Sequence, residues 1–401
     1  MDFKDSDAEA TYRAAARDWL DANIAEHDAG HYPDDMAKAK AWQARKAAGG
    51  YACITWPQEW GGGGGTPIES VIFGQEEAKH AVDGSYFTIG LGMCVPTVMA
   101  YADDATKHRF VGPAVRGDEI WSQLFSEPAG GSDVAAIRTR AVRDGDDWVI
   151  NGQKVWTSGA HYSDYGIVLV RTNPDVPKHQ GLTMFWLDLK APGIEIRPIH
   201  QMSGGSSFNE VWFEDVRISD AQRLGPVDGG WKVALFTLMN ERLAIGTSGG
   251  VGPEDILAFA AQANGADGPL LKDTAFRQTL ADWWVQSEGL RNTRMRTITA
   301  LSKGQVPGPE SSIGKIVAAN QLQAIGNTAV EAGDQYGIIS NPALTPLKGA
   351  FHAATMWAPG LRIAGGTDEI LKNIIAERVL GLPGEIRVDK DQPFRDLPVG
   401  A

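Results

Sequence analysis

The chain has 401 residues, 43% of them hydrophobic, and its 50 acidic residues outnumber its 37 Lys and Arg residues, which gives a formal net charge of −13. A chain of this length exceeds one small hydrophobic core, so we expect two or three packed modules. The acidic balance argues against a nucleic-acid partner, because binding to phosphates requires a basic face.

The sequence carries no signal for export or for a membrane. No apolar run approaches the roughly 20 residues that span a bilayer, and the start, Met1–Asp5, lacks the basic and apolar segments of a signal peptide. Cys53 and Cys94 are the only cysteines, which excludes a disulfide framework and indicates a reducing compartment. We therefore predict a cytoplasmic protein, and we expect no metal site.

Residues 1–118 are predicted to form an all-α domain. Apolar residues recur at helical spacing over 7–27 and 34–48, and the pattern returns in three later stretches. Between them, five consecutive glycines predict a loop; a flexible linker is less favoured, because the flanking tryptophans look anchored. Thr66 and Pro67 are residue types that begin a helix. The glycines are 61–65, and the later helical stretches are 67–81, 91–102 and 105–116.

Residues 119–223 are predicted to form a small antiparallel, barrel-like β domain. Their apolar residues alternate with a period of two, and glycines and prolines punctuate them at short intervals. The pair Asn151-Gly152, flanked by Val149 and Val155, predicts a tight hairpin with both turn residues at positive φ. The other expected strands are 165–171, 182–189, 194–199 and 210–218.

Residues 224–401 return to helical patterning and predict a four-helix bundle. Long helices are expected over 233–247, 273–303 and 311–336, and shorter ones over 349–357 and 368–380. Apolar residues fall on more than one face of the long helices, which predicts an oligomer because one subunit cannot bury them all. They include Ile316, Val317, Leu322, Ile325 and Val330.

Two short segments have the composition of a wall around a large planar ligand. The first, Leu124–Asp133, reads Leu-Phe-Ser-Glu-Pro-Ala-Gly-Gly-Ser-Asp, and the second, Lys154–Ser158, reads Lys-Val-Trp-Thr-Ser. Glycines let backbone N–H groups approach a ligand closely, hydroxyls can bond a heteroaromatic edge, and an indole can cover a ring face. The alternative is an ordinary Gly/Ser turn beside a core tryptophan.

The two segments resemble the two flavin-binding signatures of the acyl-CoA dehydrogenase family, whose order of all-α, all-β and all-α domains the chain also follows. The resemblance implies that Ser126 bonds the pyrimidine edge of FAD, that Trp156 stacks beside its dimethylbenzene ring and that Ser158 reaches N5. It places Ser132 against the CoA portion of an acyl-CoA substrate. Further FAD contacts are implied for Leu124, Phe125, Gly131 and Thr157.

A third segment, Ala364–Ile370, resembles the closing signature of the family. The resemblance implies that Thr367 and Glu369 contact FAD and that Gly365 and Gly366 line the substrate. The plain alternative is a helix start capped by Thr367. In many family members the catalytic glutamate stands where this chain has Gly365, which has no side chain to accept a proton.

Another position can supply the missing base. Isovaleryl-CoA dehydrogenase and some long-chain enzymes carry their glutamate directly before an arginine on the first helix of the C-terminal domain, and this chain has Glu241-Arg242 there. The resemblance therefore implies Glu241 as the base and Arg242 as its orienting partner in the substrate site. A Glu-Arg pair on a solvated helix face is the alternative reading.

The mechanism that the resemblance implies is α,β-dehydrogenation of an acyl-CoA thioester. A carboxylate held dry takes the weakly acidic α-proton, while the thioester oxygen meets a flavin ribityl hydroxyl and the Gly365 N–H. The β-hydrogen leaves as hydride to N5, giving the trans-2-enoyl-CoA, and an electron-transferring flavoprotein reoxidises FAD. The small residues after Glu241 (244–250) predict a bulky, branched or long acyl group.

The sequence alone leaves two questions open, the oligomeric state and the functional class of the protein. The family precedent implies a homodimer or homotetramer, but its Arg-x-x-Phe-Gly motif, which grips the FAD pyrophosphate of a neighbouring subunit, is absent; Lys272 or Arg277 could replace it. The later Gln-rich Gly-Gly segment is also altered, at 330–334. Two alternatives stay in view: a flavin oxidase or monooxygenase on the same fold, and a non-catalytic partner subunit of a hetero-oligomeric dehydrogenase.

Overall fold

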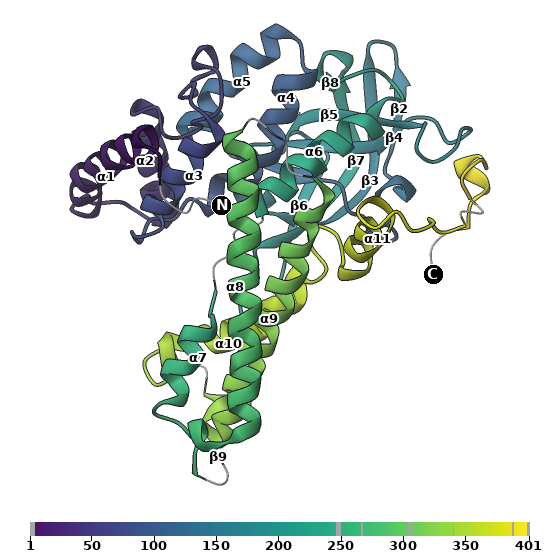
Figure 1. Ribbon diagram of the computed structural model, residues 1–401. Coiled ribbons are helices and arrows are strands. Elements are labelled where there is room, and N and C mark those ends of the chain that lie inside the picture. Colours follow the sequence, from purple (N-terminus) through teal and green to yellow (C-terminus); the bar gives the residue numbers. More distant parts are fainter. Residues whose placement is uncertain are drawn as a thin grey trace. The chain divides into compact units, whose positions relative to one another are not determined.

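The computed structural model (Figure 1) describes residues 5–245, 250–265, 268–303, 305, 308–339, 341–386 and 389–398. The chain divides into two compact units, each with a hydrophobic core of its own. The larger unit comprises Asp2–Gln201, Gly205–Ala244 and Ile386–Ala401; the smaller comprises Met1, Met202–Gly204 and Ile245–Glu385.

The larger unit begins with helices, as predicted. Ser6 and Thr66 cap the first and third of them through reciprocal bonds with Glu9 and Glu69. The stretch expected as one helix over 91–102 begins instead with a π-helical turn, Gly90–Cys94. The helices are α1 (Asp7–Asp28), α2 (Asp35–Ala48), α3 (Pro67–Glu77), α4 (Val95–Tyr101) and α5 (Asp104–Arg116).

The glycine run after α2 is a fixed loop. All five of its backbone N–H groups donate to carbonyl oxygens of residues 53–58, at 2.7–3.1 Å. At Gly62 a Cβ atom would lie 2.2 Å from the Trp56 carbonyl oxygen, so the chain passes where only glycine fits. The loop expected from the sequence is confirmed, and a flexible linker is excluded.

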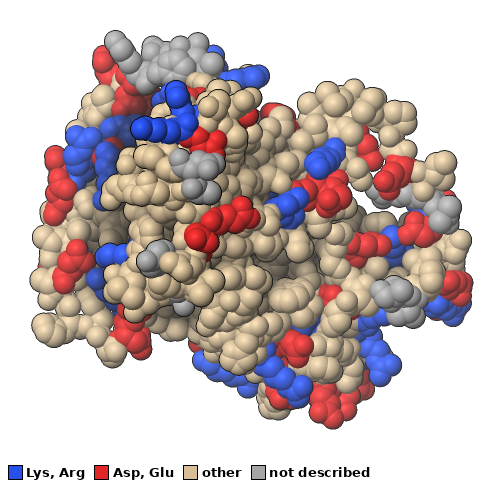
Figure 2. Space-filling view, turned by 90° about the horizontal axis from the view of Figure 1, so that it is seen from below, with Lys and Arg blue, Asp and Glu red and all other residues tan. Residues whose placement is uncertain are grey.

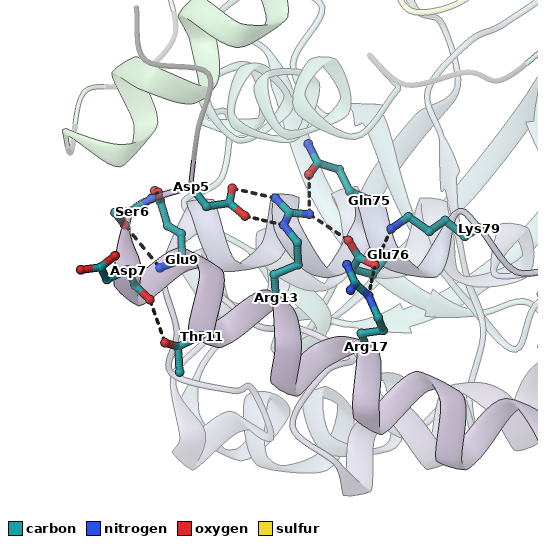
Figure 3. A network of polar contacts seen from close by, with 10 residues as sticks. All are labelled: Asp5, Ser6, Asp7, Glu9, Thr11, Arg13, Arg17, Gln75, Glu76 and Lys79. Atoms are coloured by element: carbon teal, nitrogen blue, oxygen red, sulfur yellow. Dashed lines mark hydrogen bonds and ion pairs between the residues drawn. The ribbon is translucent and has the colours of Figure 1, made fainter.

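A buried carboxylate joins α1 to α3 (Figure 3). The Glu76 carboxylate accepts from Arg13 Nη1 at 3.0 Å, Arg17 Nε at 3.2 Å and Lys79 Nζ at 2.5 Å. Burial works to raise the pKa of Glu76, but these three cations outweigh it and lower the pKa to about 2. Arg13 is itself held by Asp5.

Glu76→Gln is expected to lower the free energy of unfolding at pH 7 by about 2 kcal/mol, because charged hydrogen bonds to a buried group are lost. Since the folded-state pKa of Glu76 is depressed, its contribution is present above the unfolded value of about 4.3 and is lost as pH falls toward 2. Urea unfolding at pH 7 and pH 4 measures both effects.

Glu26→Gln is the matched control, because its ion pair with Arg45 lies at the surface and should contribute less than about 1 kcal/mol. Equal losses in the two variants would contradict the role given to Glu76.

The same unit contains a mixed sheet in the order β6-β7-β3-β2-β4-β5-β8, with β1 paired to β4. The expected antiparallel pairing holds except that β1 runs parallel to β4 and Arg140 forms one parallel pair with Arg171. The strands are β1 (Trp121–Leu124), β2 (Arg140–Asp144), β3 (Asp147–Ser158), β4 (Tyr165–Arg171), β5 (Leu182–Asp188), β6 (Ile194–Ile199), β7 (Phe208–Ser219) and β8 (Arg223–Leu224).

The prediction of a hairpin at Asn151-Gly152 is wrong. Strand β3 runs straight through these residues, and the turn lies earlier, between Asp144 and Asp147. Gly152, at φ +146°, instead marks a shift in register against β7, a bulge. A Cβ at Gly152 would lie 2.7 Å from the Thr139 Cα atom, so the glycine serves close strand packing rather than a turn.

The helices expected in the last third are present with shifted ends, and α7 is a further helix that the sequence analysis did not predict. In the larger unit, α6 buries Val233 and Ala234 in a core shared with the sheet, and Thr237 bonds Thr97 through their hydroxyls at 2.8 Å. In the smaller unit, four helices pack around Ile325 and Phe351. The bounds are α6 (Gly230–Ile245), α7 (Pro253–Ala260), α8 (Thr274–Ser302), α9 (Ser312–Ala332), α10 (Ala350–Leu361) and α11 (Asp368–Arg378).

The helix expected over 311–336 ends earlier, at Ala332, where a separate 3-10 turn, Asp334–Ile338, follows. No helix in the described part of the chain is long and apolar enough to cross a membrane. On the face shown in Figure 2, acidic and basic side chains of the described residues are interspersed rather than gathered by sign.

Candidate active site

The first two signatures lie side by side in the larger unit. Strand β1 ends at Leu124, and Leu124 and Phe125 are buried while Ser126 is half-buried. The Val155 N–H donates to the Ser126 carbonyl oxygen at 2.9 Å. The backbone of the first signature is therefore joined directly to β3, which carries the second.

An ion pair that sequence reasoning missed fixes this junction. Lys154 Nζ, fully buried, donates to Glu127 Oε1 at 2.7 Å and to the Phe125 carbonyl oxygen at 3.0 Å. Glu127 also accepts from the backbone N–H groups of Arg138 (2.5 Å) and Thr139 (2.9 Å). Burial opposes its ionisation, but the charge and hydrogen bond of Lys154 outweigh it, so the pKa of Glu127 is lowered. The signal available in the sequence was a pair of opposite charges, Glu127 in the first signature and Lys154 in the second.

Trp156 is held in an unusual conformation. Its φ is +60°, at a second register shift of β3 against β7, and its side chain is 57% exposed. The ring meets Phe208 edge to face at 6.1 Å. A non-glycine residue in the left-handed region costs on the order of 1–3 kcal/mol and points to function. The exposed indole fits a flat ligand that would cover it.

The two hydroxyls after Trp156 face different surroundings. Thr157 is buried, its carbonyl oxygen accepts from Asn209 Nδ2 at 2.9 Å, and its Oγ1 atom has no hydrogen-bond partner. Ser158 is half-buried, and its carbonyl oxygen accepts from Ser122 Oγ at 2.9 Å. These groups suit a flavin ring. The exposed indole offers a flat surface, and the unsatisfied buried hydroxyl and the half-buried hydroxyl offer hydrogen-bond donors.

The loop within the first signature starts with a tight turn. Glu127 and Gly130 exchange both backbone hydrogen bonds at 3.0 Å. Gly131 and Ser132 follow and are exposed, and no atom lies within 4 Å of a Cβ built at Gly131. The loop thus offers Ser132 to solvent, as a substrate contact requires.

In the smaller unit, the closing signature forms a glycine turn before α11. Gly365 and Gly366 have φ of +65° and +92°, and Thr367 caps the helix by accepting from the Ile370 N–H at 3.2 Å. Lys315 Nζ donates to the Gly366 carbonyl oxygen at 2.7 Å. Glu369 is exposed. The helix N-terminus is therefore shaped for an anion.

Asp368, which sequence reasoning also missed, fixes this turn. Its buried carboxylate accepts from Arg362 Nε at 2.8 Å and Asn320 Nδ2 at 3.0 Å. Burial works to raise the pKa of Asp368, but Arg362 and Asn320 outweigh it and lower the pKa. Helices α9, α10 and α11 are thereby tied together around the Gly365-Gly366 turn.

The predicted base lies within α6. Glu241 is in the helix, but its side chain and that of Arg242 fall outside the described residues, as do those of residues 243–249. The two predicted replacements for the missing arginine motif, Lys272 and Arg277, are both exposed in the smaller unit.

Three sequence models of one family cover most of the chain. The N-terminal, middle and C-terminal domains of acyl-CoA dehydrogenase match residues 6–118, 122–216 and 228–380. The acyl-CoA dehydrogenase IpdE1 of Mycobacterium tuberculosis is 35% identical over 393 residues, which cover 94% of this chain and 98% of that protein. The chain belongs to the acyl-CoA dehydrogenase family.

Other relatives extend the comparison. The acyl-CoA dehydrogenase FadE34 of Mycobacterium tuberculosis is 37% identical over 82% of this chain, but the match spans only 44% of that longer protein. Cyclohexane-1-carbonyl-CoA dehydrogenase of Geobacter metallireducens is 26% identical over 92% of this chain and 96% of that protein. The structure of the ChsE4-ChsE5 complex from Mycobacterium tuberculosis gives a TM-score of 0.77 at 27% identity, covering 96% of this chain and 100% of that one.

These findings confirm the family and the fold class predicted from the sequence. The chain is an oxidoreductase that dehydrogenates acyl-CoA thioesters, and its family is a flavoprotein family. The helical, sheet and helical parts of the structure correspond to the three family domains in the same order.

Proposed function

We propose that this acyl-CoA dehydrogenase uses FAD and that Glu241 removes the α-proton of the thioester. The observation that carries the proposal is Trp156, exposed at positive φ beside the joined signatures. Ser126, Trp156 and Ser158 of the larger unit would hold the flavin ring; for Thr367 in the smaller unit, a contact with FAD is proposed from the family resemblance alone. FAD, when bound, would supply the acceptor for the β-hydride.

The sequence context of Glu241 supports its role. It stands directly before Arg242 in α6, the position at which the resemblance places the base of isovaleryl-CoA dehydrogenase. Proton abstraction from a thioester requires a carboxylate that is held away from water. Gly365, at φ +65°, offers only its backbone N–H, which would donate to the thioester oxygen.

We infer further that the substrate carries a bulky or ring-bearing acyl group. Residues 244–250 read Ala-Ile-Gly-Thr-Ser-Gly-Gly, an unusually small set for a pocket wall, and Gly365 leaves space where relatives place a carboxylate. The name of the Geobacter relative specifies a cyclohexane ring. A structural neighbour with 25% identity and a TM-score of 0.76 is a variant of a protein described as a steroid ACAD.

Anaerobic bleaching of the flavin against a panel of thioesters tests these proposals. The purified protein should be yellow, and cyclohexane-1-carbonyl-CoA or a polycyclic acyl-CoA should reduce it at least about tenfold faster than butyryl-CoA, the scale of one pocket-filling difference. A steep preference for butyryl-CoA would refute the bulky substrate. A colourless protein that no thioester reduces would instead support a non-catalytic partner subunit.

The proposed partners are an electron-transferring flavoprotein and a second subunit. Helix α8 exposes Trp284 and Val285, the latter 70% exposed, which favours burial of this face in an assembly. The ChsE4-ChsE5 neighbour is itself a complex. We therefore propose a dimer or tetramer, homomeric or with a related chain; light scattering that returned the mass of one chain at micromolar concentration would contradict it.

We keep the cytoplasm as the proposed location. Cys53 and Cys94 are buried and are not joined by a disulfide, and burial raises the pKa of the Cys53 thiol to about 12, so that this thiol stays protonated and inert. Detection of the protein in an exported fraction of its cell would overturn this location.

A further inference from the structure

The end of the described chain forms a strap in the larger unit. Residues 389–398 run against the loop that follows β4, at 172–181. The Phe394 N–H donates to the Val176 carbonyl oxygen at 2.9 Å, and the Arg395 N–H donates to the Pro174 carbonyl oxygen at 3.0 Å. The strap is therefore a hydrogen-bonded part of this unit and not a loose tail; it belongs to the yellow part of the chain in Figure 1.

Phe394 anchors the strap between two arginines. Its buried ring lies 3.8 Å from the guanidinium carbon of Arg171 and 5.1 Å from that of Arg138. Arg171 is itself buried, and burial lowers its pKa to about 10. A cation–π contact with a ring face stabilises a desolvated guanidinium more than it stabilises an exposed guanidinium. The ring thus compensates part of the cost of burying Arg171.

The two arginines belong to the structure that shapes the Ser132 loop. Arg171 Nη2 donates to the Ala135 carbonyl oxygen at 2.5 Å, and the Arg138 N–H donates to Glu127 Oε2. Lys178 forms ion pairs with Asp133, at 2.6 Å, and with Asp389 of the strap. The loop from Glu127 to Arg138 is therefore tied to the strap at Asp133, through Lys178 and Asp389, and beyond Asp133 through the two arginines that contact Phe394.

We propose that residues 389–398 are a clamp that positions the Ser132 loop for the CoA portion of the substrate, with Phe394 as its positioning residue. This rests on the proposed substrate role of Ser132. Binding of a flexible nucleotide carrier requires a loop whose conformation is already set, because ordering it on binding would reduce affinity. The strap holds that conformation without touching the reacting carbons.

Phe394→Ala is expected to raise KM for the best acyl-CoA, and the inhibition constant of free CoA, about tenfold each. The kcat value and the flavin content should stay within about twofold, because only binding common to ground and transition states is lost. Arg395→Gln, which removes an exposed ion pair with Asp175 from the same strap, is the control and should change none of these values.

Unchanged KM and unchanged CoA inhibition in a folded Phe394→Ala protein would overturn the clamp. Lower flavin content with unchanged KM would also overturn it, since the strap would then serve stability alone. If Phe394→Ala does not fold, Phe394→Leu keeps the apolar volume, removes the ring face and is read in the same way. Failure of the unmodified enzyme to be reduced by any acyl-CoA would refute the proposed function, whereas a reducible enzyme with an unaffected variant refutes only the clamp.

Discussion

Glu241→Gln is expected to slow reduction of the flavin by acyl-CoA about 100- to 10,000-fold, the range lost when a general base is removed. Glutamine keeps the size and hydrogen bonding of the residue but cannot accept the α-proton. Cofactor content and acyl-CoA affinity should therefore remain near those of the parent. Rapid anaerobic mixing with a substrate that reduces the unmodified enzyme measures the rate.

Glu254→Gln provides the matched control, since Glu254 is an exposed residue at the start of α7. Its reduction rate should equal that of the parent. Bleaching of Glu241→Gln within about threefold of the parent rate, far inside the range for a lost base, would show that another group takes the proton.

A second change, Gly365→Glu, tests whether the commoner base position can replace Glu241. It would supply a carboxylate, but at a backbone φ of +65°, which costs an L-residue roughly 1–2 kcal/mol. We therefore expect partial recovery in the double variant and a loss of stability. Full recovery would mean that the glycine is not required by its backbone conformation.

Many helix starts could be predicted from the sequence because capping depends on residues that lie within a few positions of one another. Thr66 begins a helix where the sequence predicts one, and both Ser6 and Thr66 form reciprocal capping bonds with a glutamate three residues later. The prediction of a hairpin at Asn151-Gly152 failed because the same local chemistry occurs at two places. Asn151-Gly152 and Asp144–Asp147 both carry turn residues, and local chemistry cannot choose between them. The pairing of β3 with β7 decides for the earlier turn, and it joins residues that are 50 (Ser158 with Phe208) to 72 (Asp147 with Ser219) positions apart in the chain.

The candidate site was predictable where it resembles a family and unpredictable where it depends on distant pairs. The signatures could be named from the sequence, but Glu127 meets Lys154 only because β1 leads into a loop beside β3. Phe394 lies far along the chain from Arg138 and Arg171, and no periodicity links them. Such contacts arise from topology, which a local pattern does not contain.

Lys154→Met is expected to lower the free energy of unfolding by about 3–5 kcal/mol at pH 7.5, because it leaves the Glu127 carboxylate buried without its cation. Methionine keeps the length of the side chain, so packing is largely preserved. The Phe125 carbonyl oxygen also loses its donor, which loosens the junction of the two signatures. Flavin content after purification should therefore fall as well.

The loss should depend on pH in a definite direction. In the parent, Lys154 keeps the pKa of Glu127 below its usual range; without that cation, burial would raise the folded-state pKa above the unfolded value of about 4.3. A carboxyl whose pKa is raised in the folded state destabilises the fold least when it is protonated. The difference in the free energy of unfolding between parent and variant should therefore shrink as pH falls from 7.5 to 5.5. Urea unfolding at the two pH values measures this difference.

Lys190→Met is the control for charge removal alone, because its ion pair with Asp164 lies at the surface and should contribute less than about 1 kcal/mol at either pH. The double variant Lys154→Met, Glu127→Gln removes both charges and should recover part of the loss, since no ion is then left buried without a partner. A single Lys154→Met variant within about 1 kcal/mol of the parent at pH 7.5, with full flavin content, would contradict the argument. The two signatures would then be held together by the strand pairing of β3 and the Val155–Ser126 hydrogen bond, and not by the buried charges.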